Sequence, residues 1–284
     1  MNILVTGSSG FIGDNLVNSL NLIGHNVYCF SSKNGDIFDY NFISQYKNTQ
    51  IDLVYHLAGK TFVPDSWDNP SSFIATNTMG TLNILKFCEA KKIPLIYVSA
   101  YIYGNEVPIP ISETSEAKPN NPYALSKFMA EELCTFYSRY KGVSINIFRP
   151  FNVFGGNQDG RFLIPEIFSQ VKEGKSIIVN TLKPKRDYIY IDDLIEGLVL
   201  GMNSFNSLEI YNLGSGYSHS VESVIDIIQQ EMGTNLEVIS RNSERDNEID
   251  NVLADISKAK TRLSWEPKNS FGDGIKAIAK TLLN

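Results

Sequence analysis

The sequence has few cysteines and histidines and lacks any long apolar run. Its three cysteines and three histidines are scattered over 284 residues without the spacing of a metal-binding cluster, so we expect no metal site. The cysteines, Cys29, Cys88 and Cys134, are odd in number and lie in apolar segments, which indicates buried, reduced thiols. A transmembrane helix needs about 20 consecutive apolar residues, and the sequence contains no such run.

The sequence also lacks an excess of positive charge. It has 25 Lys and Arg against 31 Asp and Glu, which gives a net charge of -6. This balance disfavours a broad nucleic-acid or anionic-membrane surface, so an anionic ligand would be held by a few placed arginines. The first residues are expected to form a strand and do not resemble a signal peptide, so we expect a cytoplasmic protein. The chain is long enough for one large core and a second, smaller lobe.

Three glycines recur at every third residue near the start of the chain. An apolar strand expected over residues 2–6 leads directly into Gly7, Gly10 and Gly13, and an amphipathic helix expected over residues 11–23 follows. Glycine lets the backbone turn sharply and approach a pyrophosphate closely, and the helix start offers free N–H groups and a positive dipole end. A flexible loop is the alternative. The flanking strand and helix favour a dinucleotide-binding loop.

Apolar strands alternate with helical patterns through the first half of the chain. Strands are expected at residues 2–6, 27–30, 52–58, 94–99 and 144–149, and helices at 11–23, 40–47, 71–90 and 122–140. The alternation predicts an α/β fold, a Rossmann-type doubly wound parallel sheet. Beyond residue 149 the pattern becomes irregular, as expected of a substrate lobe. We therefore expect a dinucleotide-binding domain over 1–155, with returning segments near 186–213, and a smaller C-terminal substrate-binding lobe mainly over 156–284.

Tyr123 and Lys127 lie four residues apart on an expected helix. Pro122 suits the first helical position, with Asn120 or Asn121 as the cap, so Tyr123 would stand at the helix entrance. Residues i and i+4 share one helix face. A phenol has a pKa of about 10 and is a poor acid or base at neutral pH unless a nearby positive charge lowers that pKa. Beside a nicotinamide, such a pair would move a proton while a hydride moves; on its own, the spacing is also typical of a solvated helix face.

Further motifs follow in order along the chain. They are Asp36-Ile37, His56-Leu57-Ala58-Gly59, Asn77-Thr78-Met79-Gly80-Thr81, Ser99-Ala100-Tyr101-Ile102-Tyr103-Gly104, Arg149-Pro150-Phe151-Asn152-Val153-Phe154-Gly155 and Arg186-Asp187-Tyr188-Ile189-Tyr190-Ile191-Asp192-Asp193. Together with the glycine spacing and the Tyr/Lys pair, they resemble the extended short-chain dehydrogenase/reductase family over nearly the whole chain. Within it, they are similar to the NAD(P)-dependent epimerases, dehydratases and reductases that act on nucleotide sugars.

The resemblance implies a catalytic trio of Ser99, Tyr123 and Lys127. Tyr123 would exchange a proton with the sugar's C4 oxygen, and Ser99 would hydrogen-bond the same oxygen. Lys127 would lower the pKa of Tyr123 and bind the nicotinamide ribose. For Ser99, the alternative is a strand-end hydroxyl that is satisfied by the backbone.

The resemblance also implies residues that bind the two ligands. Those expected to contact the cofactor are Gly7, Gly10, Phe11, Ile12, Gly13, Ser31, Ser32, Lys33, Asp36, Ile37, Leu57, Ala58, Gly59, Asn77, Tyr123, Lys127 and Pro150. Those expected to contact a nucleoside-diphosphate sugar are Ser99, Tyr101, Asn152, Arg161, Leu163, Arg186 and Arg245. Arginine suits a diphosphate because a guanidinium matches phosphate oxygens bidentately, although surface solvation is the alternative for each arginine.

The family forms dimers through two helices that correspond to residues 71–90 and 122–140. An apolar stripe on each helix is compatible with a homodimer, and an ordinary core face explains the stripes as well. We therefore expect a homodimer, with no nucleic-acid or membrane partner.

Departures from the family pattern reduce the number of reactions that we expect this chain to catalyse. Ala100 and Tyr101 stand where 4,6-dehydratases carry an Asp-Glu pair, and neither can transfer the proton that eliminates water. After the second strand, Ser31, Ser32 and Lys33 replace the carboxylate of NAD-preferring relatives, which favours NADP(H) over NAD(H). We therefore expect NADP(H)-dependent reduction of a nucleotide-linked 4-keto-6-deoxy sugar at C4. The alternatives are a nucleotide-sugar 4-epimerase of the UDP-glucose 4-epimerase type that retains NAD and, more remotely, a non-catalytic dinucleotide-binding module.

Overall fold

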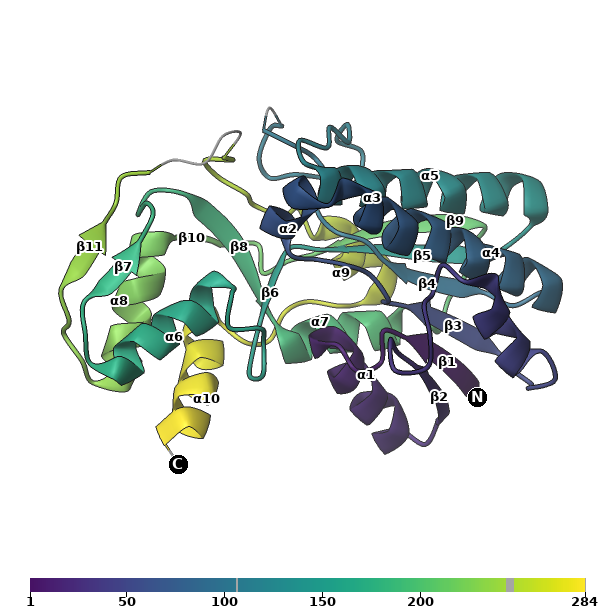
Figure 1. The fold of residues 1–284 in the computed structure, drawn as a ribbon, viewed down its shortest axis with the longest axis horizontal. Coiled ribbons are helices and arrows are strands. Elements are labelled where there is room, and N and C mark those ends of the chain that lie inside the picture. Colours follow the sequence, from purple (N-terminus) through teal and green to yellow (C-terminus); the bar gives the residue numbers. More distant parts are fainter. Residues whose placement is uncertain (106, 244–247, 284) are drawn as a thin grey trace.

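The computed structural model describes residues 1–105, 107–243 and 248–283. Figure 1 shows two unequal lobes, with the N-terminus on the larger lobe and the C-terminus on the smaller one. The larger lobe is built on a parallel sheet whose strands lie in the order β2-β1-β3-β4-β5-β9. The strands are β1 (Asn2–Thr6), β2 (Asn26–Phe30), β3 (Leu53–His56), β4 (Leu95–Val98), β5 (Ile145–Pro150) and β9 (Leu208–Leu213).

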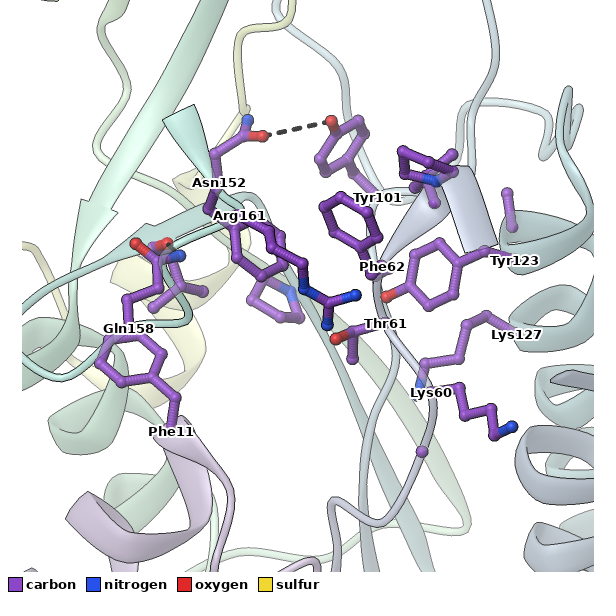
Figure 2. A pocket seen from close by; sticks show the side chains of 18 of the residues that line it. Phe11, Lys60, Thr61, Phe62, Tyr101, Tyr123, Lys127, Asn152, Gln158 and Arg161 are labelled. Atoms are coloured by element: carbon purple, nitrogen blue, oxygen red, sulfur yellow. Dashed lines mark hydrogen bonds between the residues drawn. The ribbon is translucent and has the colours of Figure 1, made fainter. Parts of the chain in front are cut away.

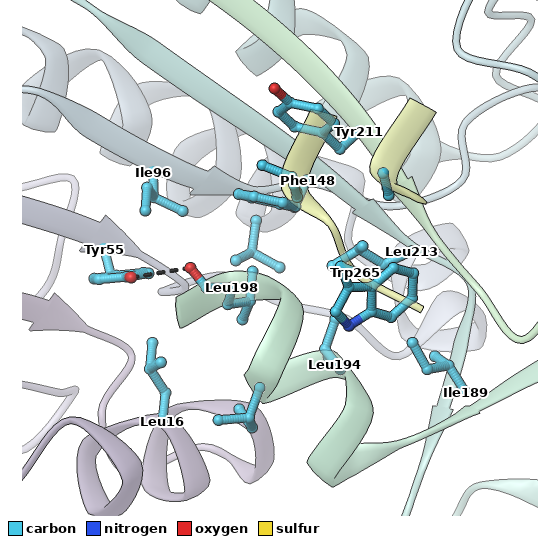
Figure 3. Packing of buried hydrophobic residues seen from close by; sticks show 14 of the residues in the cluster. Leu16, Tyr55, Ile96, Phe148, Ile189, Leu194, Leu198, Tyr211, Leu213 and Trp265 are labelled. Carbon is cyan, nitrogen blue, oxygen red and sulfur yellow. Dashed lines mark hydrogen bonds between the residues drawn. The ribbon is translucent and has the colours of Figure 1, made fainter. Parts of the chain in front are cut away.

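Helices cover both faces of this sheet. Those on one face are α1 (Phe11–Leu22), α7 (Ile191–Leu200) and α9 (Ser257–Leu263), and those on the other are α4 (Gly80–Lys91) and α5 (Pro122–Lys141). Alternate residues of β1 supply the two cores: Ile3 and Val5 face α1 and α7, while Leu4 faces α4 and α5. Figure 3 shows the first core, where the Tyr55 hydroxyl donates a 3.0 Å hydrogen bond to the Leu198 carbonyl. The expected doubly wound fold is confirmed.

The expected helix over residues 71–90 is divided. A short helix α2 (Val63–Asp68) precedes α3 (Pro70–Phe73), which Asn69 caps by accepting a 3.2 Å hydrogen bond from the Ser72 N–H. A π-helical segment, η2 (Ile74–Met79), then joins α3 to α4. Such segments interrupt the regular i to i−4 ladder and often occur near functional sites. The expected helix over residues 40–47 is the 3-10 segment η1 (Tyr40–Tyr46).

The smaller lobe has its own sheets and core. Its three-stranded sheet has the order β10-β8-β6, and β11 pairs with β7. These strands are β6 (Asn152–Phe154), β7 (Ile177–Val179), β8 (Lys185–Tyr190), β10 (Ser218–Ser220) and β11 (Val238–Ser240). The helices α6 (Leu163–Glu173), α8 (Val221–Met232) and α10 (Phe271–Leu283) pack on them around residues such as Phe154, Ile225 and Ile275. Across the described ranges, no helix is both long and apolar enough to cross a membrane.

Candidate active site

A cavity of about 1400 Å³ lies between the carboxyl edge of the large sheet and the smaller lobe. Its wall includes residues that directly follow β1, β2, β3 and β4, namely Gly7, Ser31, Leu57 and Ser99. The carboxyl edge of a parallel sheet is where doubly wound folds bind their ligands. The opposite wall comes from the smaller lobe, including Leu163 on α6 and Arg186 on β8.

The glycine loop brings the backbone close to this cavity. Gly7 has φ +72°, and a Cβ atom there would lie 2.6 Å from the Ala58 nitrogen. At Gly13, a Cβ would lie 2.1 Å from the Gly7 carbonyl oxygen, so the first turn of α1 packs directly on the loop. Gly10 is the N-cap of α1 and has no side chain with which to cap it. The N–H groups and positive dipole end of α1 are thus available at the cavity wall, which fits a dinucleotide pyrophosphate.

The end of β2 presents hydroxyl groups to the cavity. Ser31, Ser32, Asp36 and Ile37 all line it. The Ser31 N–H and hydroxyl donate to Asn34 Oδ1 at 2.9 and 3.2 Å, which holds the turn in shape. Lys33 is exposed and does not line the cavity, so its expected contact with the cofactor stays a prediction.

Lys127 is buried at the cavity wall. Its ammonium donates a 2.7 Å hydrogen bond to the Val98 carbonyl and lies 4.7 Å from the centroid of the Tyr97 ring. Burial lowers the pKa of Lys127 to about 8, although the negative charge of Glu131 opposes this change.

Tyr123 stands at the start of α5 with its hydroxyl directed into the cavity, above Lys127 (Figure 2). Asn121 is the N-cap of the helix, accepting a 2.8 Å hydrogen bond from the Ala124 N–H. Burial raises the pKa of Tyr123, so the expected lowering by Lys127 is wrong for this structure. Removing a phenolate from water is unfavourable, and the Lys127 ammonium is directed to the Val98 carbonyl.

Ser99 has a buried hydroxyl that faces the cavity. Its Oγ atom makes no hydrogen bond within the described part of the chain, whereas its backbone N–H donates to the Phe148 carbonyl at 2.7 Å. The alternative of a hydroxyl satisfied by the backbone is therefore wrong. An unpaired buried hydroxyl is costly unless something binds it, which fits a ligand oxygen at this position.

Two residues of the expected motifs lie behind the cavity wall. Asn77 accepts from the Lys60 N–H at 2.8 Å and donates to the Lys60 carbonyl and to Ser126 Oγ, and it does not line the cavity. In this structure Asn77 supports the loop after β3, and its expected cofactor contact stays a prediction. His56 is buried between the Thr6 and Thr81 hydroxyls, at 2.7 and 3.0 Å. Burial, followed by the Lys127 charge, lowers the pKa of His56 to about 3.

The residues expected to bind substrate gather on the opposite side of the cavity. The Tyr101 hydroxyl donates to Asn152 Oδ1 at 3.3 Å, and the Asn152 amide donates to the Asp187 carbonyl at 3.1 Å (Figure 2). Arg186 pairs with Glu248 and also donates to the Ile249 carbonyl. The other expected cofactor and substrate residues that line the cavity are Gly7, Gly10, Phe11, Ile12, Gly13, Leu57, Ala58, Gly59, Pro150 and Leu163.

Arg161 reaches into the cavity, where two carboxylates already hold it. Its guanidinium pairs with Asp65 at 3.0 Å and Asp159 at 2.8 Å and lies 4.2 Å from the Phe62 ring centroid (Figure 2). Arg245 lies outside the described residues. Arg241, which the sequence did not single out, lines the cavity. It belongs to the same charged stretch as Arg245, and composition does not separate two arginines four residues apart.

Comparison with known proteins agrees with this architecture. The chain matches the NAD dependent epimerase/dehydratase family over residues 3–214 and belongs to that family. A GDP-6-deoxy-D-talose 4-dehydrogenase of Aggregatibacter actinomycetemcomitans is 33% identical over 237 residues, which cover 80% of this chain and 79% of that protein.

Solved structures extend the likeness over almost the whole chain. A UDP-glucose 4-epimerase of Thermotoga maritima, solved with UDP-glucose, has a TM-score of 0.94 at 26% identity and covers 100% of this chain and 99% of its own. A UDP-glucuronic acid 4-epimerase of Bacillus cereus, solved with UDP-glucuronic acid and NAD, has a TM-score of 0.91 at 27% identity, covering 99% and 100%. RMD of Pseudomonas aeruginosa, solved with NADPH, has a TM-score of 0.90 at 25% identity, covering 98% and 97%. The chain is therefore an enzyme of the extended short-chain dehydrogenase/reductase type that uses a nicotinamide dinucleotide.

Proposed function

We propose that the protein reduces a nucleotide-linked 4-keto-6-deoxy sugar at C4 with NADPH. The observation that carries the proposal is the convergence of Ser99, Tyr123 and Lys127 on one cavity between the glycine loop and the smaller lobe. The relative named as a GDP-6-deoxy-D-talose 4-dehydrogenase supports redox chemistry at this sugar carbon. A GDP-6-deoxy-D-mannose reductase of Pseudomonas aeruginosa, 26% identical over 290 residues, supports the reductive direction.

Ser99, Tyr123 and Lys127 each have a separate role in the proposed reduction. The bound dinucleotide supplies the hydride. The unpaired Ser99 hydroxyl donates a hydrogen bond to the C4 carbonyl oxygen, and Tyr123 transfers its proton to that oxygen as the carbonyl becomes an alcohol. Because burial raises the pKa of Tyr123, the phenol keeps its proton at neutral pH, which is the form that a proton donor needs. Lys127 holds the nicotinamide ribose, and solvent returns a proton to Tyr123.

Recognition of the nucleotide sugar falls to the smaller lobe. Arg186 and Arg241 line the cavity, and Arg186 would grip the diphosphate together with Asn152. Glu248 now holds the Arg186 guanidinium, so a phosphate would replace or share this carboxylate. Arg161 pairs with Asp65 and Asp159. It would therefore line the sugar site and would not offer an unpaired positive charge to the diphosphate.

NADPH is the cofactor that we favour because the end of β2 offers serines where a carboxylate would repel a 2'-phosphate. Lys33 is exposed and is not among the residues that line the cavity, so the expected preference rests mainly on Ser31 and Ser32. NAD is the alternative, which the NAD-containing Bacillus cereus structure supports.

A nucleotide-sugar 4-epimerase with retained NAD is the second candidate. The TM-score of 0.94 to a UDP-glucose 4-epimerase favours it. An epimerase oxidises and reduces the same sugar, whereas a reductase consumes reduced cofactor from solution, so the two reactions differ in their net cofactor use.

The test follows the absorbance of the reduced nicotinamide. Purified protein is mixed with NADPH or NADH and with GDP-, dTDP-, CDP- and UDP-linked 4-keto-6-deoxy sugars. We expect consumption of NADPH with at least one of them. No consumption with any sugar, together with interconversion of UDP-glucose and UDP-galactose without added cofactor, would establish the epimerase instead.

A variant links the turnover to the proposed proton donor. Tyr123→Phe should lower kcat by about 100-fold or more, because it removes the proton donor, while dinucleotide affinity stays close to that of the wild type. Full turnover by this variant would contradict the assignment.

The proposal includes a homodimer and a cytoplasmic location. The exposed apolar residues of α5 are Leu125, Met129, Phe136 and Tyr140, which are spaced at 4, 7 and 4 residues and so share one helix face. A second copy of the chain is the partner that we propose for this stripe. The three cysteines are free thiols, as is usual in a reducing compartment. Cys88 and Cys134 are buried as expected, whereas Cys29 is exposed, so its expected burial is wrong.

A further inference from the structure

Strand β4 fixes the end of the Lys127 side chain at two consecutive residues. Val98 accepts a 2.7 Å hydrogen bond from the ammonium through its backbone carbonyl. Tyr97 presents its ring, whose centroid lies 4.7 Å from the same nitrogen. The face of an aromatic ring carries partial negative charge and attracts a cation, most strongly where water is excluded. Both residues are buried, with Tyr97 only 1% exposed.

The Tyr97 ring is itself held in place. It stacks on the His56 imidazole, with ring centroids 5.6 Å apart and an interplanar angle of 27°. His56 is fixed in turn by Thr6 on β1 and Thr81 on α4. Burial keeps the imidazole neutral, so it adds no repulsion toward the ammonium. The Tyr97 ring is therefore a rigid surface against the lysine.

Other titratable groups surround Lys127. Tyr123, Glu131 and Cys134 lie on the same helix α5, while His56 faces it from β3. The Glu131 carboxylate is already bound to the Arg149 guanidinium of β5, by contacts of 2.5 to 3.2 Å. Glu131 therefore supplies only part of the stabilisation that a buried ammonium requires, and the Tyr97 ring and the Val98 carbonyl supply the direct contacts.

We propose that Tyr97 is a positioning residue, whose ring holds the Lys127 ammonium at the cavity wall in reach of Tyr123 and the cofactor ribose. The sequence gives no sign of this role, because Tyr97 lies inside a buried strand where an aromatic residue is ordinary packing. The proposal rests on the proposed function of Lys127. The Lys127 ammonium lies over the Tyr97 ring, so the ring rather than the hydroxyl would account for the effect.

The direct test titrates the Lys127 ammonium in protein carrying 15N-labelled lysine, by NMR, with Lys127→Met to assign the signal. Tyr97→Phe keeps the ring and should leave the Lys127 pKa within a few tenths of the wild-type value. Tyr97→Leu removes the ring and should lower this pKa by about one unit, as a cation–aromatic contact in a buried site predicts. Equal Lys127 pKa values in the Leu variant and the wild type would overturn the proposal.

A second substitution covers the case in which Tyr97→Leu does not fold. Phenylalanine with one, two or three ring fluorines at position 97 keeps the shape of the ring and weakens its negative face step by step. The Lys127 pKa should fall with each fluorine. A constant pKa across the series would show that the ring acts only by packing.

The pH dependence of turnover supplies a separate readout. Burial lowers the Lys127 pKa to about 8, so the ammonium is present below this pH and lost above it. The alkaline fall in kcat/KM should therefore move to lower pH in Tyr97→Leu and stay in place in Tyr97→Phe, with little change in the KM for the sugar. If the wild type turns over no sugar, the proposed function fails, while the NMR titration still decides the position of Lys127.

Discussion

Lys127 and Tyr123 lie one turn apart on α5, and burial shifts the pKa of each toward its neutral form. The sequence predicts their pairing from the helix period, but it does not predict how much water each group loses. In the structure burial raises the pKa of the phenol, which favours its protonated form at neutral pH. The lysine has a pKa of about 8, close to neutrality, and its charge is sensitive to every neighbour. Protonation of the site is therefore set by burial more than by the i, i+4 spacing.

Removing one partner of a buried ion pair near the candidate active site should lower the free energy of unfolding substantially. Arg149 binds both carboxylate oxygens of Glu131, and both side chains are at most 6% exposed. Glu131→Gln leaves a buried guanidinium without its counter-charge, so we expect it to lower the free energy of unfolding by about 3 kcal/mol in urea titrations. As a control, Glu116→Gln breaks an exposed 3.1 Å pair with Lys118, which should change it by less than about 1 kcal/mol. Similar losses in the two variants would refute this reasoning.

The start of α1 packs closely on the glycine loop that we propose to bind the dinucleotide. Gly13 lets its first turn rest on the Gly7 carbonyl, and Gly7 lets the loop rest on the backbone after β3. Both contacts are between backbone atoms, which cannot rotate away as a side chain can. Gly7 and Gly13 therefore stand in the sequence at the two positions where backbone segments approach each other too closely for a side chain.

Filling the contact between Gly13 and the Gly7 carbonyl should separate α1 from the loop. Gly13→Ala places a Cβ 2.1 Å from the Gly7 oxygen, so the helix must move. We expect calorimetric titration to show a loss of dinucleotide affinity of about tenfold or more, which is about 1.4 kcal/mol. Gly272→Ala is the matched control because a Cβ at position 272 in α10 would meet only the Ser270 Oγ atom, at an ordinary contact distance of 3.8 Å. It should leave affinity unchanged, and alanine should stabilise the helix slightly. Wild-type affinity in Gly13→Ala would show that the loop adapts.

At the scale of the whole molecule, the cavity depends on contacts between segments distant in the sequence. The segment before α6 meets the segment around α2 through the Arg161 to Asp65 pair and through the rings of Phe62 and Phe162, whose centroids lie 5.7 Å apart. Figure 2 shows Arg161 and Phe62 side by side at this crossing. The ion pair is exposed and contributes little to stability. Its effect is local, since it shapes the part of the cavity beside Tyr123.

The proposed dimer is tested on the apolar stripe of α5. Phe136 and Tyr140 are 50% and 64% exposed, and covering them with a second copy would bury apolar surface. Phe136→Glu should shift the sedimentation velocity profile from dimer toward monomer at micromolar concentration. Leu22→Glu on α1 is the control, since Leu22 is 87% exposed and lies outside the stripe. A monomeric wild type, or a Phe136→Glu variant that stays dimeric, would contradict the proposed interface.

The sequence by itself determined the alternation of strands and helices, the glycine loop and the Tyr123/Lys127 face of α5, because each depends on neighbours within a few residues. Only the tertiary structure decided that Lys33 lies outside the cavity wall, that Asn77 supports a loop and that Arg161 pairs with two carboxylates. The Tyr97 ring under Lys127 and the Glu131 to Arg149 pair belong to the same group. Each of these outcomes depends on burial and on partners dozens of residues away, which local periodicity and spacing do not encode.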